Sequence, residues 1–392
     1  MRPFRIDLST ARLDEIRSRI EGFRWDAMPN LDGWEAGASS SFMWEVAAYW
    51  SQHYDWRAQE RELNRFPQFV APVHGVDIHF FHVRSRHPGA RPLLLLHGWP
   101  GSFFEFLHLV EPLTDPEAFG GDAADAFHVV LPSLPGYGFS GRPSAPIGPA
   151  AVARMFASLM AETLQYPDYL VQGGDWGAII ASLMGFQDAC CSGIHLNMVV
   201  PRLSQPAEGE EETIWTERFL AAMQSEGAYG ALQRSKPQSL GFAMNDSPLG
   251  VAAWIIEKFA SWSDLPLTRS GEPDLLARYS MDQLITNVMI YLANDSFVSS
   301  TWLYAGYKAE VQDLPFTRGE RCPAPTGIAA FPDPVFLPQP RSMVERNHNV
   351  VTWTKMPRGG HFAALEAPDL LLEDLRTFAR VLDAQTGRRE RA

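Results

Sequence analysis

The stretch YLVQGGDWG, residues 169–177, contains the residue with the clearest chemical potential, Asp175. A short apolar run leads into it, and glycines stand two positions before and two positions after it. This spacing is typical of a nucleophile elbow, a strand-to-helix turn so sharp that larger flanking side chains would collide. Such a turn exposes its central side chain, so we interpret Asp175 as a nucleophile. The alternative is a glycine-rich loop that contains aspartate by chance.

Aspartate at the centre of an elbow indicates different chemistry from the serine of esterases. A serine that displaces at an sp3 carbon would leave an ether, which water does not cleave. An aspartate leaves an ester, which water hydrolyses. The residue type therefore favours substrates attacked at an alkyl carbon, such as epoxides or alkyl halides.

A second motif, HGWP at residues 97–100, follows the apolar run PLLLL. In this place the backbone can turn an N–H group toward the nucleophile. The N–H groups of Trp99 and Trp176 would then form an oxyanion hole, which lowers the barrier to ester hydrolysis. The alternative is a plain tight turn.

His361, in the segment RGGHF, follows the last strand-like run and is the expected general base. Histidine is suited to accept a proton from water near neutral pH when a carboxylate orients its other nitrogen. The orienting acid should follow the preceding strand, where Asp333 is the one carboxylate available. The chain order of nucleophile, acid and histidine favours this role over a purely structural histidine.

Asp175, His361 and Asp333 can come together only if the strands that precede them end near one another in one sheet. Alternating or continuous apolar runs predict eight strands, at residues 69–73, 76–83, 92–96, 127–131, 169–171, 194–200, 326–331 and 350–356. Helical patterns lie between most of them, and runs such as LLLL are typical of strands covered on both faces. The sequence thus predicts an α/β fold with a mostly parallel sheet of eight strands.

Two further segments accompany the sheet. Apolar residues at helical spacing follow the capping residue Ser9, and an aromatic-rich helical pattern follows near Phe42. More than a hundred residues of helical pattern separate the strands that end near Val200 and begin near Thr326, which predicts an inserted cap over the site. We expect an N-terminal extension at 1–68, a core at 69–200 and 319–392, and a helical cap at 201–318.

Composition limits the function further. The 392 residues have a net charge of −13, which disfavours nucleic acid and anionic membranes as partners. Three cysteines without metal-ligand spacing, together with the lack of a long apolar run, predict a cytoplasmic protein that no membrane segment anchors.

The motifs together resemble one family. The chain is similar to epoxide hydrolases of the microsomal type, which are α/β-hydrolases with an N-terminal extension and a helical cap. The resemblance is carried, in order, by the blocks HGWPGSFFEF, LPSLPGYGFSGRP, GGDWGAIIASLMG, NDSPLGVAAWIIEKF, PTGIAAFP and RGGHFAALEAPDLL. It implies hydrolysis of a small-molecule epoxide to a vicinal diol, without a metal or organic cofactor. A homodimer is left open.

The resemblance also implies two cap tyrosines that hold the epoxide oxygen. They map to Tyr229 in AYGALQRSKP and Tyr304 in SSTWLYAGYK, with Tyr307 as a nearby rival to Tyr304. Two phenol donors can stabilise the alkoxide that forms as the ring opens.

This chain departs from the family at the acid. The family places it fourth in Phe-Pro-x-Asp/Glu, whereas here the fourth residue is Pro334 and the carboxylate of Asp333 is third. Another acid, such as Glu310, is therefore an alternative.

The same resemblance also indicates a class of substrate and a biological role. Soluble bacterial members lack the membrane anchor of the animal enzymes, and some serve natural-product pathways, including enediyne antibiotic assembly. We expect this chain in that branch. Aromatic residues of the cap suggest a bulky apolar or aromatic epoxide, although they could equally belong to the core: Phe242, Trp254, Trp262 and Trp302.

Two other functions fit parts of the pattern. A haloalkane dehalogenase also uses an aspartate nucleophile followed by tryptophan, but it holds halide with N–H groups and does not need two phenols. A catalytically silent hydrolase-fold protein would only bind an apolar ligand. The presence of both Asp175 and His361 speaks against the second alternative.

Overall fold

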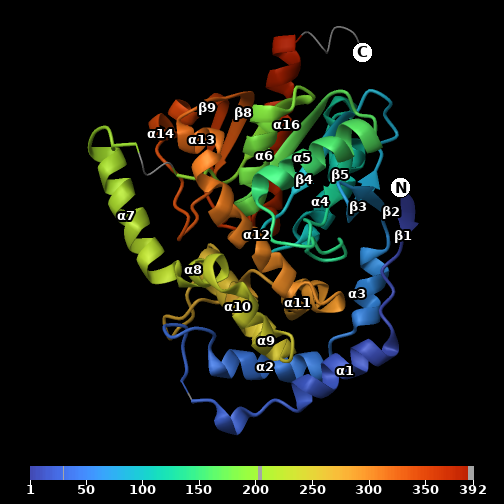
Figure 1. The fold of residues 1–392 in the computed structure, drawn as a ribbon, viewed down its shortest axis with the longest axis vertical. Coiled ribbons are helices and arrows are strands. Elements are labelled where there is room, and N and C mark those ends of the chain that lie inside the picture. The colour runs from blue at the N-terminus through green and yellow to red at the C-terminus, as the bar shows by residue number, and fades with distance from the viewer. Residues whose placement is uncertain (30, 202–204, 387–392) are drawn as a thin grey trace.

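A computed structural model describes residues 1–29, 31–201 and 205–386. Its described strands form one sheet in the order β1-β2-β3-β5-β4-β6-β7-β8-β9 (Figure 1). The strands are Arg2–Phe4 (β1), Gln68–Val73 (β2), Val76–Val83 (β3), Arg91–Leu96 (β4), Phe127–Pro132 (β5), Tyr169–Gly173 (β6), Cys191–Leu196 (β7), Cys322–Ala330 (β8) and His348–Lys355 (β9).

The predicted α/β fold with a mostly parallel sheet is confirmed. From β5 through β4 to β9 every neighbouring pair is parallel, while β1, β2, β3 and β5 pair antiparallel. All eight predicted strands are present, but the number eight is wrong, because β1 adds a ninth strand beside β2. Three residues are too few to show a strand period, so only pairing with β2 defines β1.

Helices cover both faces of the sheet. On one side α6 packs against β4, β6 and β7, with α5 beside it, and on the other α16 packs against β7, β8 and β9, with α4 beside it. All six residues of β4 and of β5 are therefore buried. The helices outside the cap are Thr10–Glu21 (α1), Ser40–Gln52 (α2), Trp56–Leu63 (α3), Leu107–Thr114 (α4), Pro149–Ser158 (α5), Asp175–Gln187 (α6), Arg341–Asn347 (α14), Ala363–Glu366 (α15) and Pro368–Thr386 (α16).

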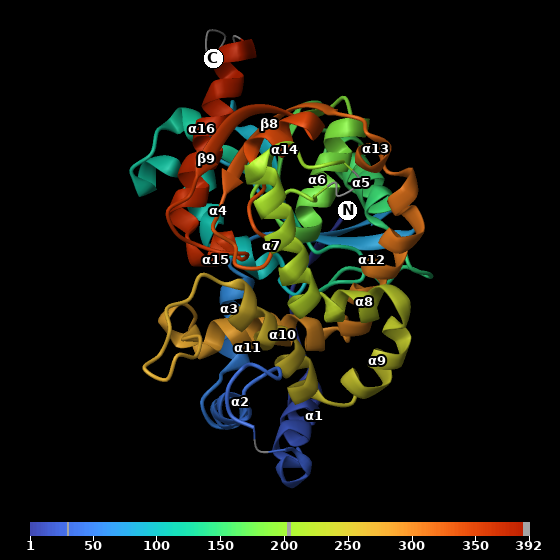
Figure 2. The same ribbon diagram turned by 90° about the vertical axis from the view of Figure 1, so that its left-hand side faces the viewer.

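The segment between β7 and β8 is helical, as the sequence pattern indicates. Its helices are Glu210–Glu226 (α7), Ala228–Ser235 (α8), Pro237–Met244 (α9), Pro248–Trp262 (α10), Met281–Ala293 (α11), Phe297–Glu310 (α12) and Pro315–Arg318 (α13). Figures 1 and 2 show α8 to α11 between the sheet and the helices α1 and α2. The exact limits of the extension, core and cap stay a prediction. The C-terminal tail GRRERA, residues 387–392, lies outside the described residues.

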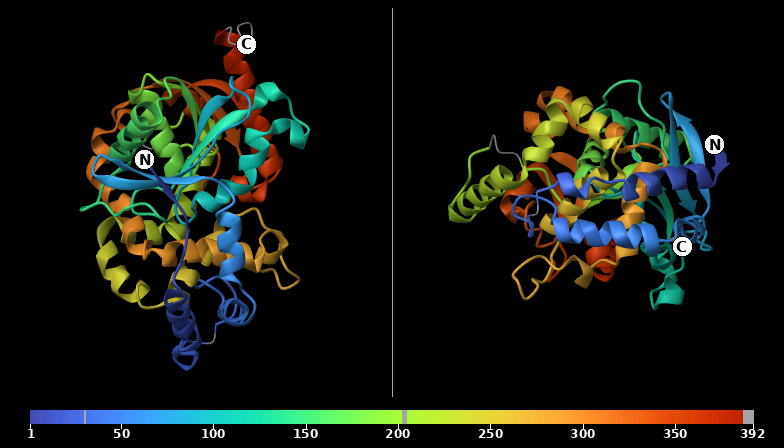
Figure 3. Two further views of the ribbon diagram at one scale, coloured as in Figure 1. Left: turned by 90° about the vertical axis from the view of Figure 1, so that its right-hand side faces the viewer. Right: turned by 90° about the horizontal axis from the view of Figure 1, so that it is seen from below.

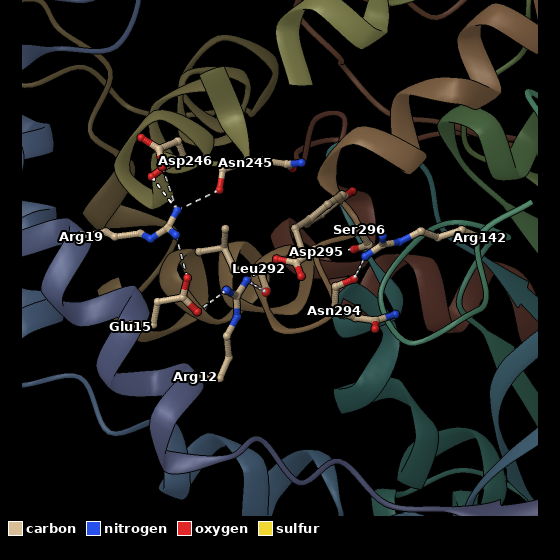
Figure 4. Close-up of polar contacts among 11 residues, drawn as sticks. Arg12, Glu15, Arg19, Arg142, Asn245, Asp246, Leu292, Asn294, Asp295 and Ser296 are labelled. Atoms are coloured by element: carbon tan, nitrogen blue, oxygen red, sulfur yellow. Dashed lines mark hydrogen bonds and ion pairs between the residues drawn. The ribbon is translucent and has the colours of Figure 1, made fainter. Parts of the chain in front are cut away.

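The N-terminal segment is joined to both the sheet and the cap. Ser9 caps α1, as predicted, by accepting a hydrogen bond from the backbone N–H of Arg12. Strand β1 extends the sheet at one edge, while α1 and α2 lie across the cap (Figure 3). Arg12 donates to the carbonyl of Leu292 and to Asp295, and Arg19 donates to Asp246 (Figure 4). These contacts tie α1 to the ends of the cap helices α9 and α11.

Helix α7 lies on the surface at the start of the cap. Its buried carboxylate, Glu212, accepts hydrogen bonds from Arg346 at 2.9 and 2.7 Å and from Ser342 at 2.5 Å. Trp215 of α7 packs in a small separate cluster with Met343 of α14. Among the described residues, no helix is long and apolar enough to cross a membrane.

Candidate active site

Asp175 is the first residue of α6 and follows directly from β6. Its φ of 48° is in the left-handed region, which is strained for an aspartate. A Cβ on Gly177 would lie 2.0 Å from the carbonyl oxygen of Leu96, and one on Gly173 would lie 2.3 Å from that of Gly177. Only glycine fits at these two positions, so the turn has the geometry that the spacing predicts for an elbow.

The carboxylate of Asp175 is held in a defined orientation. Its Oδ1 accepts a hydrogen bond from the backbone N–H of Trp99 at 2.8 Å, and its Oδ2 lies 3.5 Å from Nε2 of His361. The N-terminus of α6 adds a favourable dipole for negative charge. Trp176 follows in the first turn of α6, where a backbone N–H has no acceptor within its own helix.

His361 and Asp333 meet although they follow different strands, β9 and β8. Nδ1 of His361 lies 2.8 Å from Oδ2 of Asp333, and both side chains are buried. Oδ1 of Asp333 accepts hydrogen bonds from the backbone N–H groups of Val335 and Phe336, at 2.9 and 2.8 Å. These two donors fix the carboxylate, so the other oxygen points at the imidazole.

The alternative acid, Glu310, lies elsewhere. It is the last residue of α12, and its Oε2 accepts a hydrogen bond from the backbone N–H of Ala150 at the start of α5, at 3.0 Å. Glu310 thus accepts from the N-terminus of α5, and the structure does not bring it to His361. The one-residue shift of the acid is accommodated by the turn after Phe331, in which the N–H of Asp333 bonds to the carbonyl of Phe331.

The charge of His361 depends on its two carboxylate neighbours. Burial lowers the pKa of the imidazole, but the negative charges of Asp333 and Asp175 and their hydrogen bonds outweigh burial and raise the pKa to about 10. In the resting protein the imidazole is therefore protonated near neutral pH. Removal of either negative charge would favour loss of the proton.

Tyr229 and Tyr304 face one another from α8 and α12, with their ring centroids 5.9 Å apart. Tyr229 stacks on Trp99 at 5.1 Å with an interplanar angle of 9°, and Tyr304 packs edge-on against Trp176 at 4.7 Å. Burial, and to a lesser degree the charge of Asp175, raises the pKa of both phenols well above its usual value. Both are therefore neutral donors, and the Tyr304 hydroxyl has no hydrogen-bond partner among the described residues.

The rival tyrosine, Tyr307, lies one turn further along α12. Its ring packs edge-on against Trp176 at 5.4 Å, and among the described residues it does not stack on Trp99 or Tyr229. The structure thus places Tyr304, and not Tyr307, against both Trp99 of the HGWP turn and Trp176, which follows Asp175.

The cap aromatics have different surroundings from one another. Trp262 is fully buried and packs against the imidazole of His361 at 4.8 Å. Trp254 donates a hydrogen bond to Gln233, Trp302 is half-buried on α12, and Phe242 is 80% exposed. Phe242 therefore does not line the site, which corrects its use as an indication of a bulky substrate.

Two buried carboxylates near His361, Glu366 and Glu105, are not predicted by the sequence patterns. Glu366 accepts hydrogen bonds from the backbone N–H groups of Gly360, Phe362 and Asp264, so it fixes the histidine loop to the end of α10. Glu105 borders a cavity of about 10 Å³ with Asp175 and His361, and burial raises its pKa to about 8. The sequence feature that could have indicated them is their position in blocks that carry the family resemblance, RGGHFAALE for Glu366 and HGWPGSFFEF for Glu105.

Comparisons with known proteins agree with this geometry. Residues 1–106 match the family described as the epoxide hydrolase N terminus, and residues 91–212 match the alpha/beta hydrolase fold. Epoxide hydrolase 1 of Sus scrofa is 34% identical over 98% of this chain and 90% of the pig protein. The chain belongs to the epoxide hydrolase family.

Solved epoxide hydrolases have the same architecture. The juvenile hormone epoxide hydrolase of Bombyx mori matches with a TM-score of 0.86 and 30% identity, over 98% of this chain and 95% of its own. The Aspergillus niger epoxide hydrolase matches with a TM-score of 0.83 and 29% identity, over 97% and 96%. The chain is thus a microsomal-type epoxide hydrolase, an enzyme that hydrolyses an ether bond. This membership favours epoxide over alkyl halide and an enzyme over a silent binder.

The contacts of His361 make a prediction that does not depend on turnover. Asp175→Asn should lower the pKa of the imidazole below about 10, because one of the two carboxylates that favour its proton is lost. NMR titration of the His361 ring nitrogens would measure this, and Asp333→Asn should act in the same direction. Glu310→Gln is the matched control and should leave the titration unchanged. A shift with Glu310→Gln and none with Asp333→Asn would contradict the assignment.

Proposed function

We propose that this epoxide hydrolase works through a covalent alkyl-enzyme ester on Asp175. The observation that supports it most is the position of this carboxylate, which lies between the N–H of Trp99 and the imidazole of His361. The two neutral phenols belong to the cap helices α8 and α12 and pack against Trp99 and Trp176. Nucleophile, base and oxygen donors thus come from three separate parts of the chain and meet at the carboxyl edge of the sheet.

In the first step a carboxylate oxygen of Asp175 attacks one ring carbon. A carbon–oxygen ester bond forms as the carbon–oxygen bond of the epoxide breaks, and the electron pair of that bond goes to the epoxide oxygen. Tyr229 and Tyr304 stabilise this alkoxide, and one of them gives it a proton. Their raised pKa keeps them protonated in the resting enzyme. The phenolate regains a proton from the His361 imidazolium as the second step begins.

In the second step water hydrolyses the ester. Once Asp175 is esterified it has no negative charge, so one of the two carboxylates that hold the His361 proton is lost. The imidazolium then gives this proton to the phenolate left by the first step, directly or through water, and the neutral imidazole can act as a base. It takes a proton from water while the water oxygen bonds to the Asp175 carboxyl carbon, and Asp333 stabilises the imidazolium. The N–H groups of Trp99 and Trp176 hold the oxyanion. Collapse of the tetrahedral intermediate breaks the ester carbon–oxygen bond, and the released diol oxygen takes the proton from His361. The Asp175 carboxylic acid then returns its proton to the imidazole, which restores the resting carboxylate and imidazolium.

We further propose a bulky apolar or aromatic epoxide as substrate and a role in bacterial secondary metabolism, such as antibiotic biosynthesis. Aromatic rings around the nucleophile support the first part: Trp99, Trp176, Trp262, Tyr229 and Tyr304. The resemblance to soluble members of natural-product pathways supports the second. A cytoplasmic location and a homodimer belong to the same set of proposals.

A variant that attacks but does not hydrolyse would test the two-step scheme. In His361→Gln the nucleophile remains and the base is lost, so a stable ester should accumulate with an aryl epoxide such as styrene oxide. Intact-protein mass spectrometry should then show an increase equal to the mass of the epoxide. Asp175→Asn with the same substrate is the control and should show no increase. An unmodified His361→Gln protein that still forms diol would contradict the scheme.

The tyrosine assignment makes a separate prediction about the first step. Tyr304→Phe and Tyr229→Phe should each slow ester formation, and the double variant should lose roughly 100-fold or more, because the alkoxide then lacks its proton donors. Tyr307→Phe removes a phenol from the same helix as Tyr304 and should retain wild-type rates. Rapid-quench measurement of ester formation would decide this. A large loss in Tyr307→Phe with little in Tyr304→Phe would reverse the assignment.

A further inference from the structure

Lys258 is a buried lysine of the cap with an unusual set of neighbours. It lies on α10 and is 7% exposed. Its ammonium lies over the ring of Tyr229, 5.0 Å from the centroid, and 5.7 Å from the centroid of the Trp262 ring. Lysine is rarely buried unless its charge is paired, so its presence beside these rings calls for a physical reason.

The charge of Lys258 is compensated by acidic groups of the cap. Its Nζ lies 2.5 Å from Oε2 of Glu257 and 3.9 Å from Oε2 of Glu226, at the end of α7. A buried ion pair of this kind contributes little net stability compared with an apolar side chain of similar size. Packing alone therefore does not explain why a cation stands at this position.

The ring of Tyr229 is held by Trp99 and Lys258 in addition to its contacts with Trp262 and Tyr304. Trp99 stacks on it nearly in parallel at 5.1 Å, and Trp99 itself supplies the N–H that binds Asp175. The Lys258 ammonium supplies a further contact. A cation over an aromatic face is attracted to the ring, so Lys258 adds a polar contact to the aromatic contacts that orient the phenol.

We propose that Lys258 is a positioning residue for epoxide opening, acting through Tyr229. The inference rests on the proposed role of Tyr229 as a donor to the epoxide oxygen. As the phenol gives up its proton, negative charge develops on the ring and the attraction to the ammonium increases. Lys258 thus both orients the phenol and favours its transfer of a proton. Ester hydrolysis uses His361 and should not need this contact.

Step-resolved kinetics on the full-length enzyme would test the proposal. Lys258→Met keeps the length of the side chain and removes the charge. Tryptophan fluorescence in single turnovers would monitor the formation of the ester from styrene oxide. Its rate should fall by about 5- to 30-fold, which corresponds to the free energy of a cation–π contact. The rate of ester hydrolysis, measured in the same experiment, should change by less than about twofold. Lys258→Arg should restore most of the rate of opening.

Two controls separate positioning from folding. Lys308→Met removes an exposed lysine from α12, the helix of Tyr304, and should leave both steps unchanged. Lys258→Met with Glu257→Gln removes both charges, which avoids an unpaired buried carboxylate, and should still show slow opening. Equal slowing of both steps, or normal opening in Lys258→Met, would overturn the proposal. A wild-type enzyme that forms no ester would instead overturn the proposed function, whatever Lys258 does.

Discussion

The buried imidazole of His361 lies between two carboxylates, and the rest of the site depends on this arrangement. Nδ1 lies 2.8 Å from Asp333 and Nε2 lies 3.5 Å from Asp175. A buried charge is costly unless it is paired, so the two carboxylates and the imidazolium stabilise one another. In the proposed mechanism, esterification of Asp175 removes one partner, so the first chemical step prepares the base for the second.

This arrangement requires the core and the cap to keep a fixed position relative to one another. Asp175, Asp333 and His361 follow β6, β8 and β9, whereas both tyrosines come from cap helices. The histidine loop is fixed to the end of α10 because the N–H of His361 bonds to the carbonyl of Trp262, and Glu366 accepts from both segments. Helix α1 holds the far ends of the cap helices. His361 and the two tyrosines, the proposed base and oxygen donors, are therefore held by the same contacts between core and cap.

Local patterns in the sequence predicted much of this site. The elbow is visible because steric limits act within five residues, and the strands are visible because burial on both faces gives continuous apolar runs. Asp333 could be predicted only as a candidate, since its orientation depends on two backbone donors after Pro334. The tyrosines came from resemblance, because residues 75 positions apart in the cap have no local signal of contact.

Contacts between distant segments account for what the sequence did not predict. Strand β1 is defined by pairing with β2, and Glu366 accepts a hydrogen bond from the backbone N–H of Asp264, just after the end of α10. Phe242 has a type that suits a pocket, yet the turn of α9 directs it to solvent. Lys258 stands in the block that carries the resemblance, but its place over the Tyr229 ring requires α8 and α10 to be packed together.

A single turnover in heavy-oxygen water tests the central claim most directly. Water attacks the carboxyl carbon of the ester in this account, so the label should enter the Asp175 side chain, and mass spectrometry of the peptide that contains it should show one heavy oxygen. The first-turnover diol should carry an unlabelled oxygen from the enzyme. Label found only in the diol, with none in the Asp175 peptide, would show direct attack of water on the epoxide and contradict the covalent mechanism.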